Sequence, residues 1–144
     1  MSGRGHRVPR RSQPALQGRV VLLVEDEALI VLDMTHALER AGARVLSAAS
    51  ATQALARLAG AMRPDAAVLD LRLRREGDSV RVAARLDALG VPFLLHTGDA
   101  LRQGALIEQL GVPVLHKTYP SHHLAERVAE LLGAPGPAGP SPVR

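Results

Sequence analysis

Short apolar runs recur along the chain, and each is followed by a stretch whose apolar residues repeat every three to four positions. The runs are too short for buried helices. Runs rich in Val, Leu and Ala without polar alternation are typical of parallel strands that are buried on both faces. We therefore expect strands at residues 20–24, 44–47, 66–69, 91–95 and 112–115.

The stretches between these runs have the periodicity of amphipathic helices. In the first of them, a single apolar face runs over residues 30–41, and Gly42 ends the helix. Ser50 and Gln53 form a capping-box pair before the second helix, and Ser121 is expected to cap the last one. The other expected helices cover residues 51–58, 80–86, 101–110 and 124–132.

Strict alternation of strands and helices predicts an α/β fold, in which helices cover both faces of a parallel sheet. The length of 144 residues fits one domain. In such sheets, ligands bind outside the carboxyl ends of the strands. The residues directly after each apolar run are therefore the first candidates for a functional site.

Both ends of the chain depart from this pattern. Residues 1–18 mix Arg, Gly, Pro, Ser and Gln without periodicity, and residues 133–144 are rich in Pro and Gly. Such compositions favour flexible tails. We expect one globular domain over residues 19–132, between a basic N-terminal tail and a Pro/Gly-rich C-terminal tail.

The net charge of +4 is concentrated in these ends. Six of the 18 basic residues and none of the 14 acidic ones lie in residues 1–19 and 133–144, so 12 basic residues face 14 acidic ones and residues 20–132 carry −2. The globular part is mildly acidic, so nucleic-acid binding is not expected there, and only the basic arm offers a weak alternative. One Phe, one Tyr and no Trp leave no aromatic platform for base stacking.

The chain has no cysteine, which excludes disulfides, thiolate metal sites and cysteine nucleophiles. No apolar segment has the form of a signal peptide or a membrane span. We expect a cytoplasmic protein that does not enter a membrane.

Polar residues follow four of the five expected strands. Glu25 and Asp26 come after the first, Asp70 after the third, Thr97 after the fourth and Lys117 after the fifth. Clustered carboxylates repel one another unless a cation lies among them, and oxygen ligands without cysteine favour Mg²⁺. A carboxylate flanked by Mg²⁺, a lysine and a hydroxyl is suited to attack phosphorus and to hold an aspartyl phosphate.

Each of these residues also has an ordinary interpretation. Asp26 fits a helix N-cap, and Asp70 fits the start of a turn. Thr97 fits a turn that leads into a helix, while Glu25 and Lys117 fit solvated charges. Lys117 favours a site, because it is the only lysine among 18 basic residues and its compact charge suits a crowded phosphoryl site. We therefore favour a common site over four separate coincidences.

At these residues the sequence resembles the receiver domains of two-component response regulators, over residues 19–132. The matching segments are Val21-Leu22-Leu23-Val24-Glu25-Asp26-Glu27, Pro64-Asp65-Ala66-Ala67-Val68-Leu69-Asp70-Leu71, Thr97-Gly98 and Lys117.

The resemblance implies a flavodoxin-like fold, a three-layer sandwich around a five-stranded parallel sheet of order 2-1-3-4-5. It implies that Asp70 accepts the phosphoryl group. It also implies that Asp26, Asp70 and the backbone carbonyl of Arg72 bind Mg²⁺, and that Glu25 supports the metal through water.

By the same resemblance, Thr97 and Lys117 would hold the phosphoryl oxygens.

Two positions depart from the family pattern. Lys117 is followed by Thr118, where the family has a proline in a cis bond. A non-proline cis bond costs about 3 kcal/mol, so we expect this loop to be either trans or strained. Val114 stands where the family has an aromatic switch residue, so the usual coupling between the threonine and an aromatic ring is not assumed.

The segment 92–98 is similar to a subgroup of often stand-alone receivers that is named for a Phe-Ala-Thr-Gly string, with Leu95 and His96 in place of Phe and Ala. A dehalogenase-type phosphatase is excluded, because its second aspartate would stand at Arg72. No Gly-rich nucleotide-binding motif follows any strand.

The resemblance implies a single-domain response regulator that receives a phosphoryl group from a histidine kinase or a histidine phosphotransfer protein. Such a protein is a signalling phosphoacceptor rather than an enzyme, and it would signal by binding a downstream protein that the sequence does not identify. A homodimer stays open. The alternative is an adaptor with the receiver fold that binds its partners independently of phosphorylation.

Overall fold

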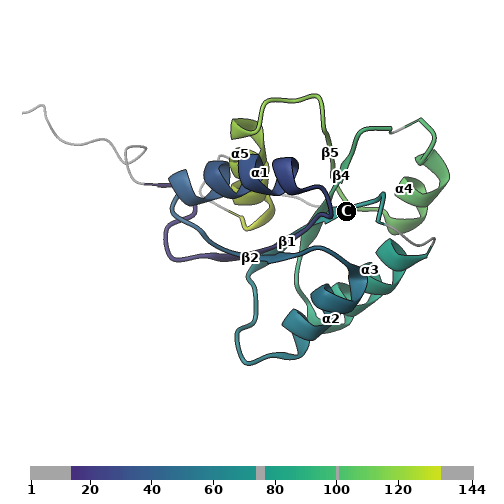
Figure 1. Ribbon diagram of the computed structural model, residues 1–144, viewed down its shortest axis with the longest axis horizontal. Helices are drawn as coiled ribbons and strands as arrows, with labels where there is room; N and C mark the ends of the chain where they lie inside the picture. The colour runs from purple at the N-terminus through teal and green to yellow at the C-terminus, as the bar shows by residue number, and fades with distance from the viewer. Residues whose placement is uncertain (1–13, 74–76, 100, 134–144) are drawn as a thin grey trace, which may run out of the picture.

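The computed structural model describes residues 14–73, 77–99 and 101–133 of the chain. Its centre is a five-stranded sheet of order β2-β1-β3-β4-β5, and every described strand pair is parallel. Figure 1 shows this sheet with helices on both sides of it. The predicted fold class and strand order are thereby confirmed. The strands are β1 Val20–Val24, β2 Arg44–Ala48, β3 Ala66–Asp70, β4 Phe93–Thr97 and β5 Val114–His116.

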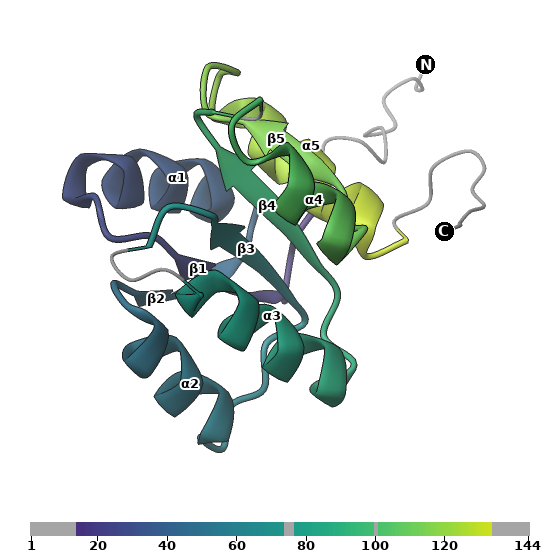
Figure 2. The same cartoon turned by 90° about the vertical axis from the view of Figure 1, so that its right-hand side faces the viewer.

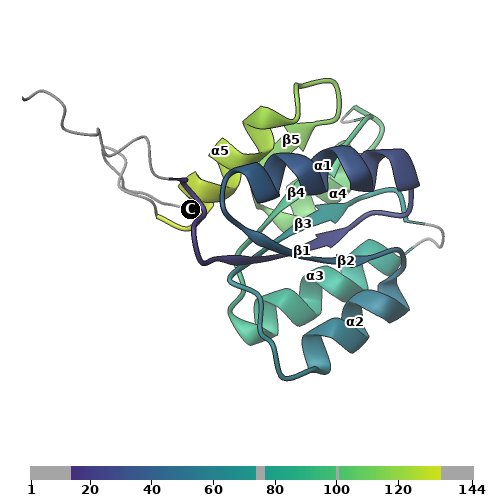
Figure 3. The same cartoon turned by 60° about the vertical axis from the view of Figure 1, so that its left-hand side comes forward.

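Helices cover both faces of the sheet. The helices α1 and α5 lie on one face, while α2 and α3 lie on the other (Figure 3). The short helix α4 packs its partly buried apolar residues against the same core as α2 and α3. The helices are α1 Ala28–Arg40, α2 Ala51–Ala59, α3 Asp78–Leu89, α4 Gly104–Leu110 and α5 His122–Leu131.

Alternation along the buried strands divides the apolar side chains between two cores. On β1, Leu22 faces the core under α2 and α3, whereas Leu23 faces the core under α1 and α5. On β4, Leu95 and Leu94 divide in the same way. This two-sided burial explains why the strands read as unbroken apolar runs.

The last two strands begin two residues later than the apolar pattern predicts. Pro92 and Pro113 stand immediately before β4 and β5, and proline has no N–H to donate to a strand ladder. Their carbonyl oxygens still accept hydrogen bonds, from Ala67 N–H at 3.0 Å and from Leu95 N–H at 2.8 Å respectively. The prolines therefore mark where these strands join the sheet.

The two predicted caps have different outcomes. Ser50 Oγ accepts a hydrogen bond from Gln53 N–H at 3.1 Å, and Gln53 Oε1 accepts one from Ala49 N–H at 2.8 Å, so the capping pair before α2 is confirmed. The predicted cap at Ser121 is wrong. Its backbone is already helical, and its hydroxyl donates to Asp33 Oδ1 of α1 at 3.2 Å instead of accepting from α5.

Residues 14–18 differ from the expected N-terminal tail. Leu16 is fully buried in the core under α1 and α5, and its N–H donates to Ala41 O at 2.7 Å. Gly42 has a φ of +98°, and a Cβ there would lie 2.8 Å from Gln17 Cα, so only glycine permits this close approach. The rest of the expected N-terminal tail, and all of the C-terminal one except Gly133, lie outside the described residues.

Among the helices of the described ranges, none combines the length and the apolar character that crossing a bilayer requires.

Candidate functional site

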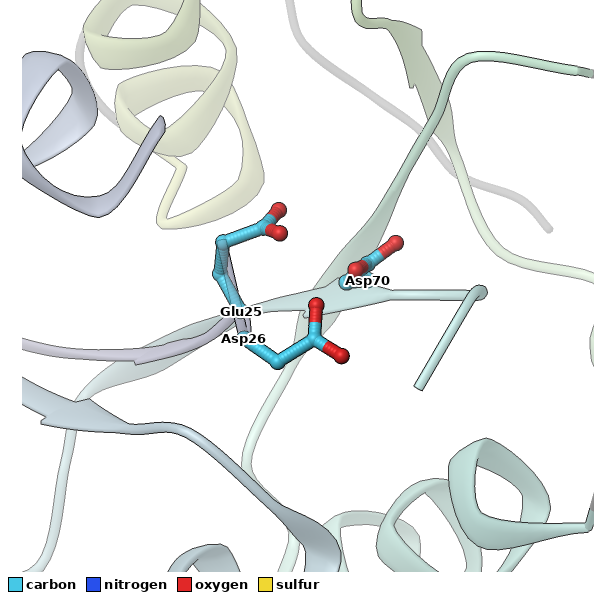
Figure 4. Close-up of side chains that lie close together, drawn as sticks. All are labelled: Glu25, Asp26 and Asp70. Atoms are coloured by element: carbon cyan, nitrogen blue, oxygen red, sulfur yellow. The ribbon is translucent and has the colours of Figure 1, made fainter. Parts of the chain in front are cut away.

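The carboxyl ends of β1 and β3 place three acidic side chains together. Glu25 and Asp26 follow β1, and Asp70 is the last residue of β3, the neighbouring strand. One carboxylate oxygen from each residue lies within 4.8 Å of the others. Figure 4 shows the three side chains around one space at the end of the two strands. The sequence prediction that these acids meet at one edge of the sheet is therefore confirmed.

The three acids differ in burial. Glu25 and Asp70 are each only 1% exposed, whereas Asp26 is exposed. Asp26 does not cap α1, because the N-cap position is Glu27 and no side chain makes a capping hydrogen bond there. The cluster therefore has a buried floor and one solvent-facing acid.

Lys117 reaches both buried carboxylates from the loop after β5. Its Nζ lies 3.3 Å from Glu25 Oε1 and 3.3 Å from Asp70 Oδ1. The backbone N–H of Lys117 donates to Thr97 O at 2.8 Å, so the start of this loop is hydrogen-bonded to the end of β4. The peptide bond to Thr118 is trans. A trans bond thus leaves the lysine in contact with the acids, although the family proline is missing.

Burial and neighbouring charges shift the two buried carboxyl groups in opposite directions. Burial is the main cause that raises the pKa of Asp70 to about 6, and the nearby Glu25 carboxylate adds to this, while the Arg72 N–H and Lys117 oppose it. Burial also acts to raise the pKa of Glu25, but His96, Lys117 and the Glu27 N–H together outweigh it and lower that pKa. Glu25 therefore holds its charge more firmly than Asp70 does.

Two oxygens of the site fit a metal ion. Asp70 Oδ1 accepts a hydrogen bond from Arg72 N–H at 2.9 Å, but Asp70 Oδ2 is buried without a hydrogen-bond partner in the described part of the chain. Glu25 Oε1 is also buried without a hydrogen bond there, and its charged neighbour is Lys117 Nζ at 3.3 Å. Buried polar atoms are normally paired. An all-oxygen donor set with unused lone pairs suits Mg²⁺, and the backbone of Arg72 is held directly beside it.

Thr97 is fully buried at the end of β4, but its side chain takes part in a turn. Its Oγ1 accepts a hydrogen bond from Asp99 N–H at 3.1 Å. Within the described residues, no hydrogen bond joins Thr97 to Asp70. The ordinary turn that the sequence suggested is therefore present at Thr97, and the bond from Arg72 N–H forms a turn at Asp70 as well. A role of Thr97 in the site stays a prediction.

His96 is a site residue that the sequence analysis missed. It is 7% exposed, and its Nδ1 lies 3.9 Å from Glu25 Oε1 without a hydrogen-bond partner among the described residues. A histidine within an otherwise apolar strand was the available signal. The sequence does not show which face of the sheet the His96 side chain occupies, because both faces of β4 are buried.

A cleft of about 800 Å³ is lined by residues of the segment after β3 and of helix α4. Figure 2 shows α4 in front of β4 and above α3. Arg72 and Ser79 contribute to its wall, and Ser79 Oγ also donates to Asp70 O at 2.9 Å. The cleft therefore adjoins the acidic cluster without containing its carboxylates. Its other lining residues are Leu71, Leu73, Gly77, Val80, Arg102, Gln103, Ala105, Leu106 and Gln109.

The sequence matches no protein-family model, and no curated protein sequence matches it. Solved structures do match. A response regulator receiver protein from Sinorhizobium medicae WSM419 is 30% identical with a TM-score of 0.68, over 83% of this chain and 98% of that chain. The chain belongs to the receiver domains of response regulators.

Two other solved receiver domains are similar to this one. The receiver domain of a sensor histidine kinase from Pseudomonas aeruginosa PAO1 is 29% identical with a TM-score of 0.69, over 81% of this chain and 99% of that chain, and it is described with a magnesium ion coordinated in its active site cleft. A response regulator receiver protein from Burkholderia phymatum is 22% identical with a TM-score of 0.72, over 83% of this chain and 99% of that chain, and it supports the fold.

In this receiver domain, the residues on either side of Lys117 differ in burial. Val114 is partly buried at the start of β5, and Tyr119, on the other side of Lys117, is 50% exposed. An aromatic ring is therefore absent from the position that precedes the lysine by three residues. Membership of the subgroup named for the Phe-Ala-Thr-Gly string stays a prediction.

Proposed function

We propose that this receiver domain accepts a phosphoryl group on Asp70, in the cytoplasm, from a phosphohistidine of a histidine kinase or a histidine phosphotransfer protein. The observation that carries the proposal is the position of Asp70. Its carboxylate is buried in a cluster of three acids, one of its oxygens has no described hydrogen-bond partner, and the only lysine of the chain lies 3.3 Å away.

Glu25, Asp26, Asp70 and the backbone carbonyl of Arg72 would hold Mg²⁺, with Glu25 acting through water. When bound, Mg²⁺ supplies positive charge that neutralises the oxygens of the transferring phosphoryl group. The exposed position of Asp26 leaves a path from solvent to this cluster.

In the transfer, a carboxylate oxygen of Asp70 forms a bond to phosphorus while the bond between phosphorus and the partner's histidine nitrogen breaks. The electron pair of the broken bond stays on that nitrogen. Lys117 Nζ is placed to donate to the phosphoryl oxygens. Thr97 Oγ1 accepts from Asp99 N–H, so its own O–H remains available to donate to the same oxygens.

Phosphorylation would then change the affinity of the domain for a downstream protein, and formation of a homodimer is one way in which it could act. Two hydrogen bonds connect the residues of the proposed site to neighbouring elements. Ser79 links α3 to the carbonyl of Asp70, and the backbone of Lys117 is bonded to the end of β4.

The test is intact mass spectrometry after incubation with acetyl phosphate and Mg²⁺. The wild type should gain one labile phosphoryl group, and removal of Mg²⁺ with a chelator should prevent this. The variant Asp70→Asn should gain none. The matched control Asp87→Asn, which changes an exposed aspartate on α3, should behave as the wild type does.

A wild type that gains no adduct would next be tested with beryllofluoride and Mg²⁺, which together imitate an aspartyl phosphate. Failure of that binding as well would contradict the proposal. The alternative, an adaptor whose binding is independent of phosphorylation, would then be favoured.

A further inference from the structure

Glu25 has a buried carboxylate that needs a partner in every state of the domain. Its Oε2 accepts a hydrogen bond from Glu27 N–H at 3.2 Å, and its Oε1 lies 3.3 Å from Lys117 Nζ. The residue is 1% exposed, so water cannot readily replace these contacts. An unpaired buried carboxylate is strongly destabilising.

Lys117 divides its charge between two carboxylates, because its Nζ is as close to Asp70 Oδ1 as to Glu25 Oε1. A phosphoryl group on Asp70 adds negative charge and strong acceptor oxygens. The flexible stem of a lysine allows its ammonium group to turn toward them. Glu25 Oε1 then loses the cation that lies closest to it.

His96 supplies another nitrogen beside the same oxygen. Its Nδ1 is 3.9 Å from Glu25 Oε1. Hydrogen bonds between nitrogen and oxygen extend to about 3.2 Å, so a movement of less than about 1 Å would bring the two atoms into hydrogen-bond distance. The atom is buried and has no hydrogen-bond partner in the described residues. The main chain of His96 is fixed next to the phosphoacceptor, since His96 pairs in register with Asp70 and its carbonyl accepts from Leu71 N–H at 3.4 Å.

From these contacts, and resting on the proposed function, we infer that His96 is a positioning residue that replaces Lys117 as the partner of Glu25 in the phosphorylated state. Its Nδ1–H donates to Glu25 Oε1 when Lys117 turns to the phosphoryl oxygens. Glu25 then keeps its charge and its orientation toward the metal-binding oxygens. The exchange changes hydrogen bonds only, and no covalent bond forms or breaks.

The test compares two substitutions at His96 by their affinity for beryllofluoride in the presence of Mg²⁺, measured by isothermal titration calorimetry. His96→Asn keeps an N–H donor near the position of Nδ1, whereas His96→Leu has a similar volume and no donor. We expect the Asn variant to bind within about threefold of the wild type, and the Leu variant to bind about tenfold or more weakly, which is the effect of one hydrogen bond to a charged group.

A second measurement follows the wild type itself, and the variant His96→Asn serves only to assign the resonance. With ¹⁵N-labelled histidine, the Nδ1 resonance of His96, identified by its loss in His96→Asn, should shift when beryllofluoride is added to the Mg²⁺-bound protein. A resonance that stays in place while beryllofluoride binds would overturn the role of His96 and leave the proposed function intact. Equal losses of affinity in the two variants would do the same. A wild type that binds no beryllofluoride would overturn both.

Discussion

At the scale of single residues, the site has more negative charge than its one lysine can balance. Three carboxylates lie within 4.8 Å of one another, and Lys117 touches only the two buried ones. Asp26 is the exposed member, so its substitution would remove a proposed metal ligand without leaving a cavity. It is therefore the best position at which to test metal binding separately from folding.

Asp26→Asn should weaken Mg²⁺ binding by about tenfold or more, because Mg²⁺ in proteins depends on one or two carboxylates. Isothermal titration calorimetry with Mg²⁺ measures this. Asp87→Asn serves as the control and should keep the affinity of the wild type. Equal Mg²⁺ affinity in Asp26→Asn and the wild type would remove Asp26 from the metal site.

Asp70→Asn should stabilise the metal-free domain, and the gain should grow with pH. A carboxyl whose pKa is raised from 3.8 to about 6 by folding binds its proton more tightly in the folded state. The wild type therefore loses stability as the pH rises from about 4 to above 6, and the Asn variant does not share this loss. The difference above pH 7 should be roughly 1–3 kcal/mol.

Urea unfolding in the presence of a chelator, repeated between pH 4 and pH 8, measures this difference. Asp87→Asn should show no comparable dependence on pH, since its side chain is exposed. A variant that is less stable than the wild type at every pH would show that the Asp70 carboxylate is well compensated by Lys117 and Arg72.

Sequence reasoning identified the acids and the lysine of the site because their position depends on strand ends alone. It did not identify His96, whose role depends on which face of β4 it occupies. In the structure, Glu25, Asp70 and His96 each come two residues after a residue of the core under α1 and α5, namely Leu23, Val68 and Leu94. A strand that is buried on both faces carries no polar alternation from which this face could be inferred.

At the scale of elements, the two serines next to helix N-termini make opposite contacts. Ser50 accepts a hydrogen bond from α2, whereas Ser121 donates one to another helix. Ser50→Ala should therefore cost about 1 kcal/mol of unfolding free energy, and Ser121→Ala should cost less than about 0.5 kcal/mol. Urea unfolding of the two variants at one pH gives the comparison, and a larger loss in Ser121→Ala would contradict it.

The elements themselves could be predicted because hydrophobic periodicity and prolines are local signals. The cap at Ser50 was predictable, since the box needs only Ser50 and Gln53 at the right spacing. The failure of the cap at Ser121 could not be predicted, because it depends on the position of α1. Asp33 of that helix accepts the hydrogen bond from the Ser121 hydroxyl. Tertiary contact overrides local preference there.

At the scale of the whole molecule, the domain begins earlier than its composition suggests. A single buried leucine, Leu16, in a polar stretch gives no periodicity, so only the packed structure could place it in the core. Alternation predicted a parallel sheet with helices on both faces but no strand order, and the order 2-1-3-4-5 was available only from the resemblance to receiver domains.

Leu16→Ala should cost about 2–4 kcal/mol of unfolding free energy, the usual result of truncating a fully buried leucine. Leu29→Ala is the matched control, because Leu29 is 78% exposed on α1. It should change stability by less than about 0.5 kcal/mol. Equal effects of the two substitutions would place residues 14–18 outside the folded domain.

The strand order also has a consequence for the sequence of folding events. β2, β1 and β3 are neighbours in the sheet and also the first three strands of the chain, so during synthesis they can pair before β4 and β5 have emerged. All three acids belong to this early part, while Lys117 follows the last strand. During synthesis, the nascent sheet can therefore bring its negative charges together before their counter-ion arrives. Refolding followed by stopped-flow circular dichroism should accordingly be faster with Mg²⁺ at constant ionic strength, and this acceleration should shrink in Asp26→Asn.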